Sequence, residues 1–189
     1  MKGTDEKFMK RALLLARRGR GRVSPNPMVG AVIAKKGKII GEGWHDTYGG
    51  SHAEVHALNE IKAGKNKYGG KGSVLYVTLE PCAHFGKTPP CVDSILQAGI
   101  SRVIIGTKDP NPLVSGKSIR KLRARGVETE VGILEKECLE LNEKFFKYMH
   151  QGMPFITLKI AQTLDGRIAA SSGDSRWISS PASRKLAHK

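Results

Sequence analysis

The segment "VTLEPCAHFGKTPPCVDSIL" (residues 77–96) contains two of the three cysteines in this 189-residue chain. A strand-like run ends at Glu80, and Cys82 follows directly after Pro81. Cys91 follows a pair of prolines and begins a segment with the composition of a short helix. Two thiols on a loop stiffened by prolines are compatible with a disulfide, a metal site, a catalytic thiol or no function at all. Other parts of the sequence decide between these four interpretations.

The cysteine count argues against a disulfide framework, because three is both odd and small for a protein of this length. The N-terminal residues 1–21 place acidic residues before a short apolar patch and arginines after it, the reverse of a secretory signal. No run approaches the roughly 18 apolar residues that span a bilayer. We therefore expect a cytoplasmic protein without a membrane partner, in which paired thiols serve as metal ligands or catalytic groups.

The net charge of +15 favours an anionic partner, either nucleic acid or a small phosphorylated molecule, although a solvated basic surface is equally consistent with it. Aromatic residues make up only 6% of the chain, so the stacking surface needed to bind single-stranded nucleic acid is thin. A small phosphorylated substrate is the partner that we predict, and nucleic acid is not expected.

Strand-like and helix-like segments alternate along most of the chain. The apolar spacing predicts helices over residues 4–18, 51–64, 91–99, 116–126 and 135–152, the second capped by Ser51 and the last one continuous. Strands are predicted over residues 28–34 and 38–44, which form a hairpin, and over 73–80, 102–107 and 127–134. This order predicts an α/β domain with three layers (α/β/α), in which helices cover both faces of a mixed central sheet.

The sequence changes character near "QGMPF" (residues 151–155). A strand-like segment, residues 155–161, is followed by a turn at Asp165-Gly166, a loop rich in glycine and serine, and a helix that begins near Ser180. We therefore expect one domain over residues 1–150, and a linker with the incomplete start of a second domain over residues 151–189, because so short a remnant seldom builds its own core.

A metal site is the reading of the two cysteines that we favour. His52 begins the predicted second helix, and the loops at the carboxyl ends of strands in an open α/β sheet meet in one crevice, so His52, Cys82 and Cys91 can converge there. One imidazole and two thiolates suit Zn²⁺. Three protein ligands leave one position open, which is typical of a catalytic zinc site and not of a structural one.

Glu54 lies two residues beyond His52, on the first turn of the same predicted helix. Zinc activates water near neutral pH, and a neighbouring carboxylate can take up the proton and pass it to a leaving group. This combination suits hydrolysis at an electron-poor ring carbon that carries an amino group, and nucleobase deaminases use such a His-x-Glu and Pro-Cys pattern.

The segments "HAE" (52–54) and "PCAHFGKTPPC" (81–91) closely resemble the deaminase domain of the riboflavin-biosynthesis deaminase/reductases, a branch of the cytidine-deaminase-like proteins. The segments "SPNPMVGAVI" (24–33), "GEGWHDTYGGSHAEVHAL" (41–58) and "DPNPLVSGKSI" (109–119) extend the resemblance over residues 1–150. Eight residues separate the two cysteines where the short form of the motif has two, and this longer loop is characteristic of the riboflavin branch. Residues 155–180 resemble the opening of the reductase domain of the same family.

The resemblance implies a role for each matching position. His52, Cys82 and Cys91 would bind zinc, and Glu54 would be the catalytic proton shuttle. The substrate pocket would be formed by Asn26, His45, Lys87, Asp109 and Asn111. In the reductase segment, Ala161, Ser175 and Trp177 would meet nucleotide or substrate.

The implied reaction is hydrolytic removal of the 2-amino group from 2,5-diamino-6-ribosylamino-4(3H)-pyrimidinone 5′-phosphate. A chain that continued into a complete reductase domain would be bifunctional and would use NADPH, whereas we expect no reductase activity from residues 1–189 alone. A homo-oligomer is also expected.

Two other functions fit parts of the sequence. A zinc deaminase that acts on another base, such as guanine or adenosine in tRNA, would share the same ligands. A nucleic-acid-binding module with a structural zinc ion would fit the positive charge, and it predicts a fourth protein ligand to the metal together with salt-dependent binding.

Overall fold

The computed structural model describes residues 2–63, 69–85, 89–112 and 114–188. Contacts between residues divide the chain into two units, residues 1–154 and residues 155–189. The strands all belong to the first unit: β1 (Gly30–Lys35), β2 (Lys38–Trp44), β3 (Val74–Leu79), β4 (Arg102–Thr107) and β5 (Glu128–Val131).

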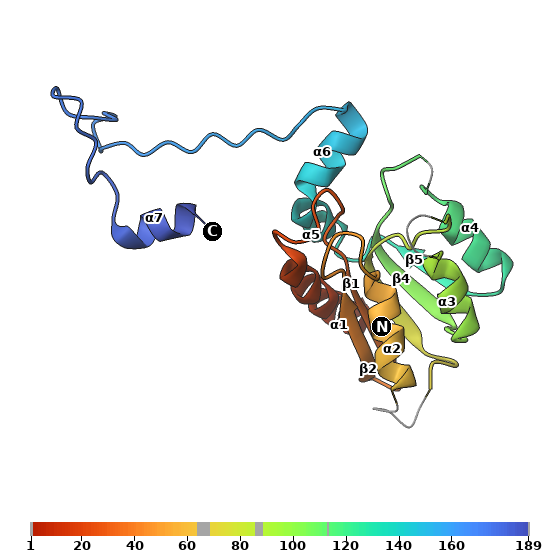
Figure 1. Ribbon diagram of the computed structural model, residues 1–189. Helices are drawn as coiled ribbons and strands as arrows, with labels where there is room; N and C mark the ends of the chain where they lie inside the picture. The colour runs from red at the N-terminus through yellow and green to blue at the C-terminus, as the bar shows by residue number, and fades with distance from the viewer. Residues whose placement is uncertain (1, 64–68, 86–88, 113, 189) are drawn as a thin grey trace. The chain divides into compact units, whose positions relative to one another are not determined.

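The five strands form one mixed sheet in the order β2-β1-β3-β4-β5 (Figure 1). β1 pairs antiparallel with both β2 and β3, whereas β3, β4 and β5 run parallel to one another. The predicted mixed sheet and its hairpin are therefore confirmed. Because of this pairing, the start of β1 lies beside the ends of β2 and β3, at the same edge as the end of β4.

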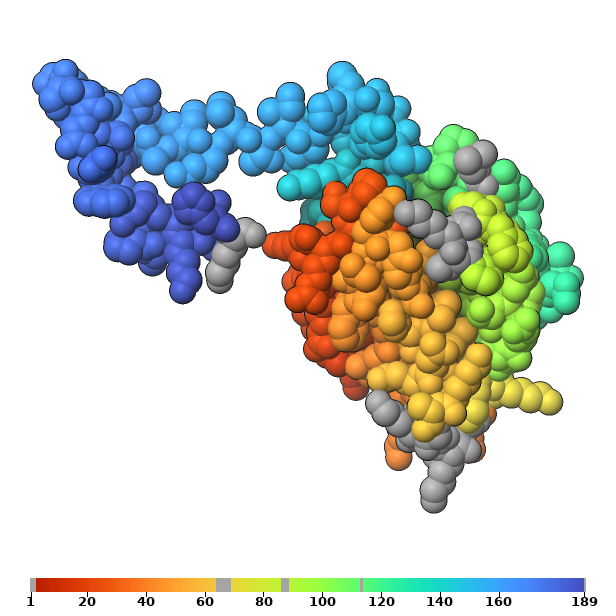
Figure 2. Space-filling view, viewed as in Figure 1, coloured from red at the N-terminus to blue at the C-terminus, as the bar shows by residue number. Residues whose placement is uncertain are grey.

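Helices cover both faces of the sheet, as the alternating pattern predicted. One face packs against α2 (Ala53–Lys62), α3 (Cys91–Gln97) and α4 (Lys117–Ala124), through a core that includes Ala57, Ile95 and Leu122. Figure 2 shows the segments of α2 and α3 side by side on this face. The other face packs against α1 (Lys2–Ala16) and α5 (Glu135–Leu141), and a short 3₁₀ turn, η1 (Arg17–Gly19), follows α1.

α2 lies unusually close to β2, and two glycines allow this approach. A Cβ atom on Gly41 would lie 2.3 Å from the carbonyl oxygen of Ala57, and a Cβ atom on Gly43 would lie 2.3 Å from that of Ala53. A side chain at either position would therefore push the helix away from the sheet. These glycines fix the height of the helix above the strand.

Two predicted helix starts were wrong. α1 begins at Lys2, so Thr4 lies inside the helix. α2 is capped by His52, whose backbone is extended (φ −75°, ψ 160°), and not by Ser51. No side-chain hydrogen bond caps α2, which leaves the His52 imidazole free to face another part of the molecule.

The long helix predicted over residues 135–152 was also wrong as a single element. It consists of α5 and α6 (Glu143–Gln151), and the chain bends between them at Asn142 (φ −117°, ψ 26°). Asn142 is buried, and its carboxamide bonds to the backbone of Met28, 114 residues earlier. The residue at the bend is therefore bonded to the backbone of a residue far away in the sequence, Met28.

The second unit contains α7 (Pro181–Ala187), capped by the Ser180 hydroxyl, which accepts a hydrogen bond from the Ser183 amide. The predicted strand over residues 155–161 was wrong, because the described residues of this unit form no strand. An isolated strand has no neighbour to satisfy its backbone hydrogen bonds. Within the described ranges, none of the helices combines the length and apolar character needed to cross a bilayer.

Candidate active site

The predicted metal ligands come from three neighbouring elements of the fold. His52 is the cap of α2, Cys82 follows β3, and Cys91 is the first residue of α3. The Nδ1 atom of His52 lies 3.2 Å from the Sγ atom of Cys91 and 3.5 Å from that of Cys82. All three ligand atoms lie within 4.8 Å of one another. The structure therefore brings together the three side chains that the sequence singled out.

The start of α3 holds Cys82 in place through the backbone. The Cys91 amide donates to the Cys82 sulfur over 3.3 Å, and the Val92 amide donates to the Cys82 carbonyl over 3.3 Å. Amide donors and the positive end of a helix dipole favour thiolate over thiol. The pKa of Cys82 is lowered to about 4, chiefly by the hydrogen bond from the Cys91 thiol and also by that with His52.

His52 and Cys91 hold their protons more tightly than free side chains do, because both lie beside the Cys82 thiolate. The hydrogen bond to Cys82 raises the pKa of His52 to about 9, and the hydrogen bond to Cys82 together with burial raises the pKa of Cys91. Protons on His52 and Cys91 thus offset the negative charge of the Cys82 thiolate. Such a donor set fits a divalent cation that prefers nitrogen and sulfur, and within the described ranges the cluster has three members and no fourth protein ligand.

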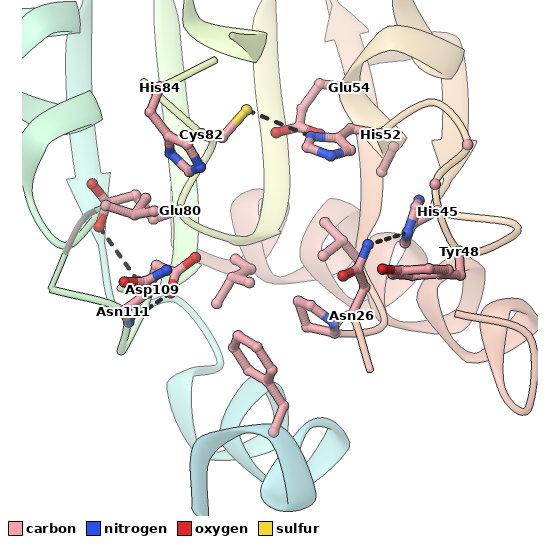
Figure 3. A pocket seen from close by; sticks show the side chains of 18 residues that line it. Asn26, His45, Tyr48, His52, Glu54, Glu80, Cys82, His84, Asp109 and Asn111 are labelled. Carbon is pink, nitrogen blue, oxygen red and sulfur yellow. Dashed lines mark hydrogen bonds between the residues drawn. The ribbon is translucent and has the colours of Figure 1, made fainter. Parts of the chain in front are cut away.

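Glu54 lies on the first turn of α2, beside this cluster, and is only 3% exposed. In Figure 3 its carboxyl group points toward His52 and Cys82. Burial raises the pKa of Glu54, and the nearby His52 opposes this shift. A carboxyl group whose pKa is raised in this way holds a proton more readily than a free one, which suits a group that both accepts and returns a proton.

These groups lie at one end of a cavity of about 310 Å³, within the size range of small-ligand sites. It opens at the sheet edge where β2, β3 and β4 end and β1 begins, which is the expected place for a site in an α/β fold. Figure 3 shows two walls: Asn26, His45 and Tyr48 on one side, and Glu80, Asp109 and Asn111 on the other. We call them the Asn26 wall and the Asp109 wall.

Hydrogen bonds fix the Asn26 wall. The Nδ1 atom of His45 lies 3.0 Å from the Ser51 carbonyl oxygen, which can only accept, so Nδ1 carries the proton. The Nε2 atom of the same neutral ring then accepts a hydrogen bond from the Asn26 amide over 3.2 Å. Burial lowers the pKa of His45, which favours this neutral form. The Asn26 amide group is thereby oriented, and its carbonyl oxygen is left for other donors.

The buried carboxylate of Glu80 holds the Asp109 wall. Glu80 accepts hydrogen bonds from the Ser118 hydroxyl over 2.6 Å, from the Gly116 amide over 2.9 Å and from the Asp109 amide over 3.4 Å. Asp109 in turn accepts a hydrogen bond from the Asn111 amide over 2.8 Å. Burial raises the pKa of Asp109 to about 6, and Glu80 adds to the shift.

Most of the predicted deaminase residues meet in this cavity. Asn26, His45, His52, Glu54, Cys82, Asp109 and Asn111 line it, and Cys91 contacts two of them. Lys87 lies outside the described residues. Ala161, Ser175 and Trp177 lie in the second unit, where the Trp177 ring is 72% exposed and stacks with the Arg184 guanidinium at 3.9 Å.

Several residues that shape the cavity were not predicted from the sequence. Glu80 had a usable signal, because it is an acidic residue at the end of an apolar strand. Tyr48 and Phe145 also line the cavity. Phe145 carried no signal, since an aromatic residue on a helix is usually part of the core and only the tertiary structure brings α6 to the cavity.

Comparison with known proteins gives two family matches. Residues 2–107 match the cytidine and deoxycytidylate deaminase zinc-binding region, and residues 154–189 match the RibD C-terminal domain. The riboflavin biosynthesis protein RibD of Aquifex aeolicus is 55% identical over 97% of this chain and 50% of its own length.

Two further relatives differ in length. The diaminohydroxyphosphoribosylamino-pyrimidine deaminase of Buchnera aphidicola subsp. Schizaphis graminum is 51% identical over 79% of this chain and 99% of its own length. The crystal structure of a diaminohydroxyphosphoribosylaminopyrimidine deaminase/5-amino-6-(5-phosphoribosylamino)uracil reductase from Thermotoga maritima superposes with a TM-score of 0.92 at 48% identity, covering 99% of this chain and 53% of that one. The chain thus spans about half the length of the RibD relatives that it matches.

Proposed function

Because the chain belongs to the diaminohydroxyphosphoribosylaminopyrimidine deaminase family of riboflavin biosynthesis, we propose that it removes the 2-amino group of 2,5-diamino-6-ribosylamino-4(3H)-pyrimidinone 5′-phosphate by hydrolysis. The observation that supports this most strongly is the cluster of His52, Cys82 and Cys91 with buried Glu54 beside it, at the end of a cavity of about 310 Å³. The net reaction replaces a ring C–NH₂ group with C=O, consumes one water and releases ammonia.

In this proposal, His52, Cys82 and Cys91 hold the zinc ion of the family. When bound, zinc supplies the Lewis acidity that makes water nucleophilic near neutral pH. With three protein ligands, the bound ion would keep one coordination position for water or substrate. The Cys91 amide, which donates to the Cys82 sulfur, stabilises the thiolate that such a cation requires.

Glu54 moves the protons. Its carboxylate accepts a proton from the attacking water and donates one to the amino group as that group departs, so the residue returns to its starting state. The raised pKa of Glu54 suits both steps, because a group that titrates nearer to neutrality can accept and release a proton with little driving force in either direction.

The two walls orient the substrate. The Asn26 amide, fixed by neutral His45, can pair with the edge of a pyrimidinone, which presents both donors and acceptors. Asp109 and Asn111 line the opposite side of the cavity, where they can pair with hydroxyl or amino groups of the substrate. Lys87, outside the described residues, is proposed to pair with the 5′-phosphate, and the net charge of +15 favours an anionic substrate.

Residues 151–189 are proposed to begin a reductase domain. Their match to the RibD C-terminal domain supports this, and in a longer chain Ala161, Ser175 and Trp177 would contact NADPH or substrate. Free thiolates are needed at the proposed metal site, so we propose a reducing compartment such as the cytoplasm. Assembly into a homo-oligomer stays a prediction. Sedimentation equilibrium tests it by measuring the mass of the protein in solution.

The test of the proposed function compares substrates. The zinc-loaded chain is incubated separately with the pyrimidinone nucleotide, with guanine and with tRNA, and ammonia release is measured. We expect turnover of the pyrimidinone nucleotide alone. Turnover of guanine or tRNA adenosine with no reaction of the pyrimidinone nucleotide would assign the chain to another class of deaminase.

A further inference from the structure

Residues 108–153 lie between the two regions that match family models, so the shared zinc-binding region does not include them. They nevertheless contribute Asp109, Asn111, Val114 and Phe145 to the cavity. The features that distinguish this pocket from other cytidine-deaminase-like pockets are therefore expected in this part of the chain. The bend between α5 and α6 brings Asn142 into hydrogen-bonding contact with Met28, in the loop that carries Asn26.

Asn142 bonds to one residue of the cavity loop twice. Its Oδ1 atom accepts a hydrogen bond from the Met28 amide over 2.8 Å, and its Nδ2 atom donates to the Met28 carbonyl oxygen over 2.8 Å. Residue 28 lies two positions before β1, where a neighbouring strand would normally bond to its backbone amide and carbonyl. The Asn142 side chain satisfies these two groups instead. Asn142 is 5% exposed and Met28 is half-buried, so both bonds are partly shielded from water.

The loop held in this way forms part of the cavity. Asn26, Pro27 and Val29 line the cavity, and Met28 lies between them. A shift of the Met28 backbone would displace Asn26, whose amide is paired with His45. Phe145 follows Asn142 by three residues and also lines the cavity, so one bend in the chain sets both the loop and this ring.

We propose that Asn142 is a positioning residue of the substrate pocket, which holds the loop of Asn26 in the conformation that binds substrate. This inference rests on the proposed deaminase function. Only a carboxamide of this length offers an acceptor and a donor to the two groups of one peptide residue. Aspartate keeps the acceptor, but it loses the donor and brings a negative charge to the Met28 carbonyl oxygen.

The variants Asn142→Ala and Asn142→Asp test the proposal through kinetics. We expect both to raise the KM of the pyrimidinone nucleotide roughly tenfold, the size of effect expected when one or two neutral hydrogen bonds are lost. The kcat and the zinc content should stay close to those of the unsubstituted chain, because neither Glu54 nor the metal ligands contact Asn142. An unchanged KM, or a loss confined to kcat, would overturn the proposal.

A double-mutant cycle with Asn26→Ala separates positioning from general stability. If Asn142 acts through Asn26, then adding Asn142→Ala to Asn26→Ala should raise KM little further. The matched control is Tyr76→Phe, which removes a buried hydrogen bond to Asp5 on the other face of the sheet. This control should lower the unfolding midpoint and leave KM unchanged. Independent effects of the two asparagine variants on KM would contradict the proposed route.

A measurement without substrate keeps this proposal separate from the proposed function. Hydrogen exchange of the Met28 amide should be at least about tenfold faster in Asn142→Ala, because its acceptor is gone. If the unsubstituted chain fails to deaminate the pyrimidinone nucleotide, the proposed function is wrong. The exchange rate still tests whether Asn142 holds the Met28 backbone. Unchanged protection of the Met28 amide would show that Asn142 does not hold the loop.

Discussion

Asp109 and Glu54 are two carboxyl groups of one cavity, and burial raises the pKa of both. For Asp109 the value is about 6, against 3.8 for the free side chain. An acid whose pKa is raised by folding makes the folded protein less stable once it ionises. The cost is absent below the unfolded value of 3.8 and is fully present above about 6.

Replacing Asp109 with asparagine should therefore stabilise the substrate-free protein near pH 7.5, by about 1 kcal/mol. The asparagine oxygen can still accept the hydrogen bond from the Asn111 amide. The advantage should shrink as the pH falls from about 6 toward 3.8. Urea unfolding of both proteins at several pH values measures it, and an Asp109→Asn variant that is less stable at pH 7.5 would contradict this account of the wall.

Single residues were predictable where chemistry restricts the residue type. A histidine with two cysteines, and a glutamate two positions from the histidine, point to metal chemistry in any fold, and the structure does bring these four side chains together. The position of Glu80 at the end of an apolar strand was a usable signal, but its partner Gly116 lies 36 residues away, and Asn142 had no such signal because its partner lies 114 residues away. Nothing in the local sequence states which distant backbone group a polar side chain will meet.

At the scale of the elements, the site depends on how closely α2 approaches β2. The first residues of α2 carry Glu54 and follow His52, and the glycines of β2 set the position of this helix. A Cβ atom at Gly43 would lie 2.3 Å from the Ala53 carbonyl oxygen and 2.6 Å from the Ala57 amide nitrogen. Both are backbone atoms, so a rotamer change cannot relieve the overlap.

The variant Gly43→Ala should lose about 1–3 kcal/mol of stability, as overpacked sites do, and it should also reduce ammonia release because Glu54 moves with the helix. The control is Gly3→Ala in α1, where an added Cβ meets nothing within 4 Å. Urea unfolding and the ammonia assay are run on both variants. If Gly43→Ala matched the unsubstituted chain in stability and activity, the close approach would not be what positions the site.

Element boundaries were predicted less well than the elements themselves. The periodicity of residues 135–152 is helical on both sides of Asn142, so the pattern alone predicts one continuous helix and gives no sign of the bend. The strand-like composition of residues 155–161 was misleading for the opposite reason, since a strand forms only beside another strand and the described part of this segment forms none. Both errors arise from tertiary context, which overrides local propensity.

At the scale of the whole molecule, the proposed deaminase site lies entirely within residues 1–154, the first of the two units. Most of residues 155–188 are exposed, including Ile156 and Leu158 at 81% each. A chain shortened to residues 1–154 should therefore keep the unfolding midpoint and the ammonia release of the 189-residue chain, and it should be more soluble because exposed apolar side chains are removed.

Calorimetry and the ammonia assay on both lengths test this expectation. A shortened chain that folds with bound zinc but no longer releases ammonia would show that the second unit contributes to the site.

Alternation of strands and helices sufficed to predict the layers of the first unit. The strand order was not predictable, because the hairpin could have paired at either edge of the parallel strands.

The central claim is that His52, Cys82 and Cys91 hold zinc while Glu54 moves the protons of the hydrolysis. The most direct test is the variant Glu54→Gln, which keeps the shape of the side chain and removes its acid–base chemistry. We predict about one zinc ion per chain in both proteins, and a fall in ammonia release from the pyrimidinone nucleotide of about 10²- to 10⁴-fold. Full zinc content with undiminished ammonia release would contradict the account.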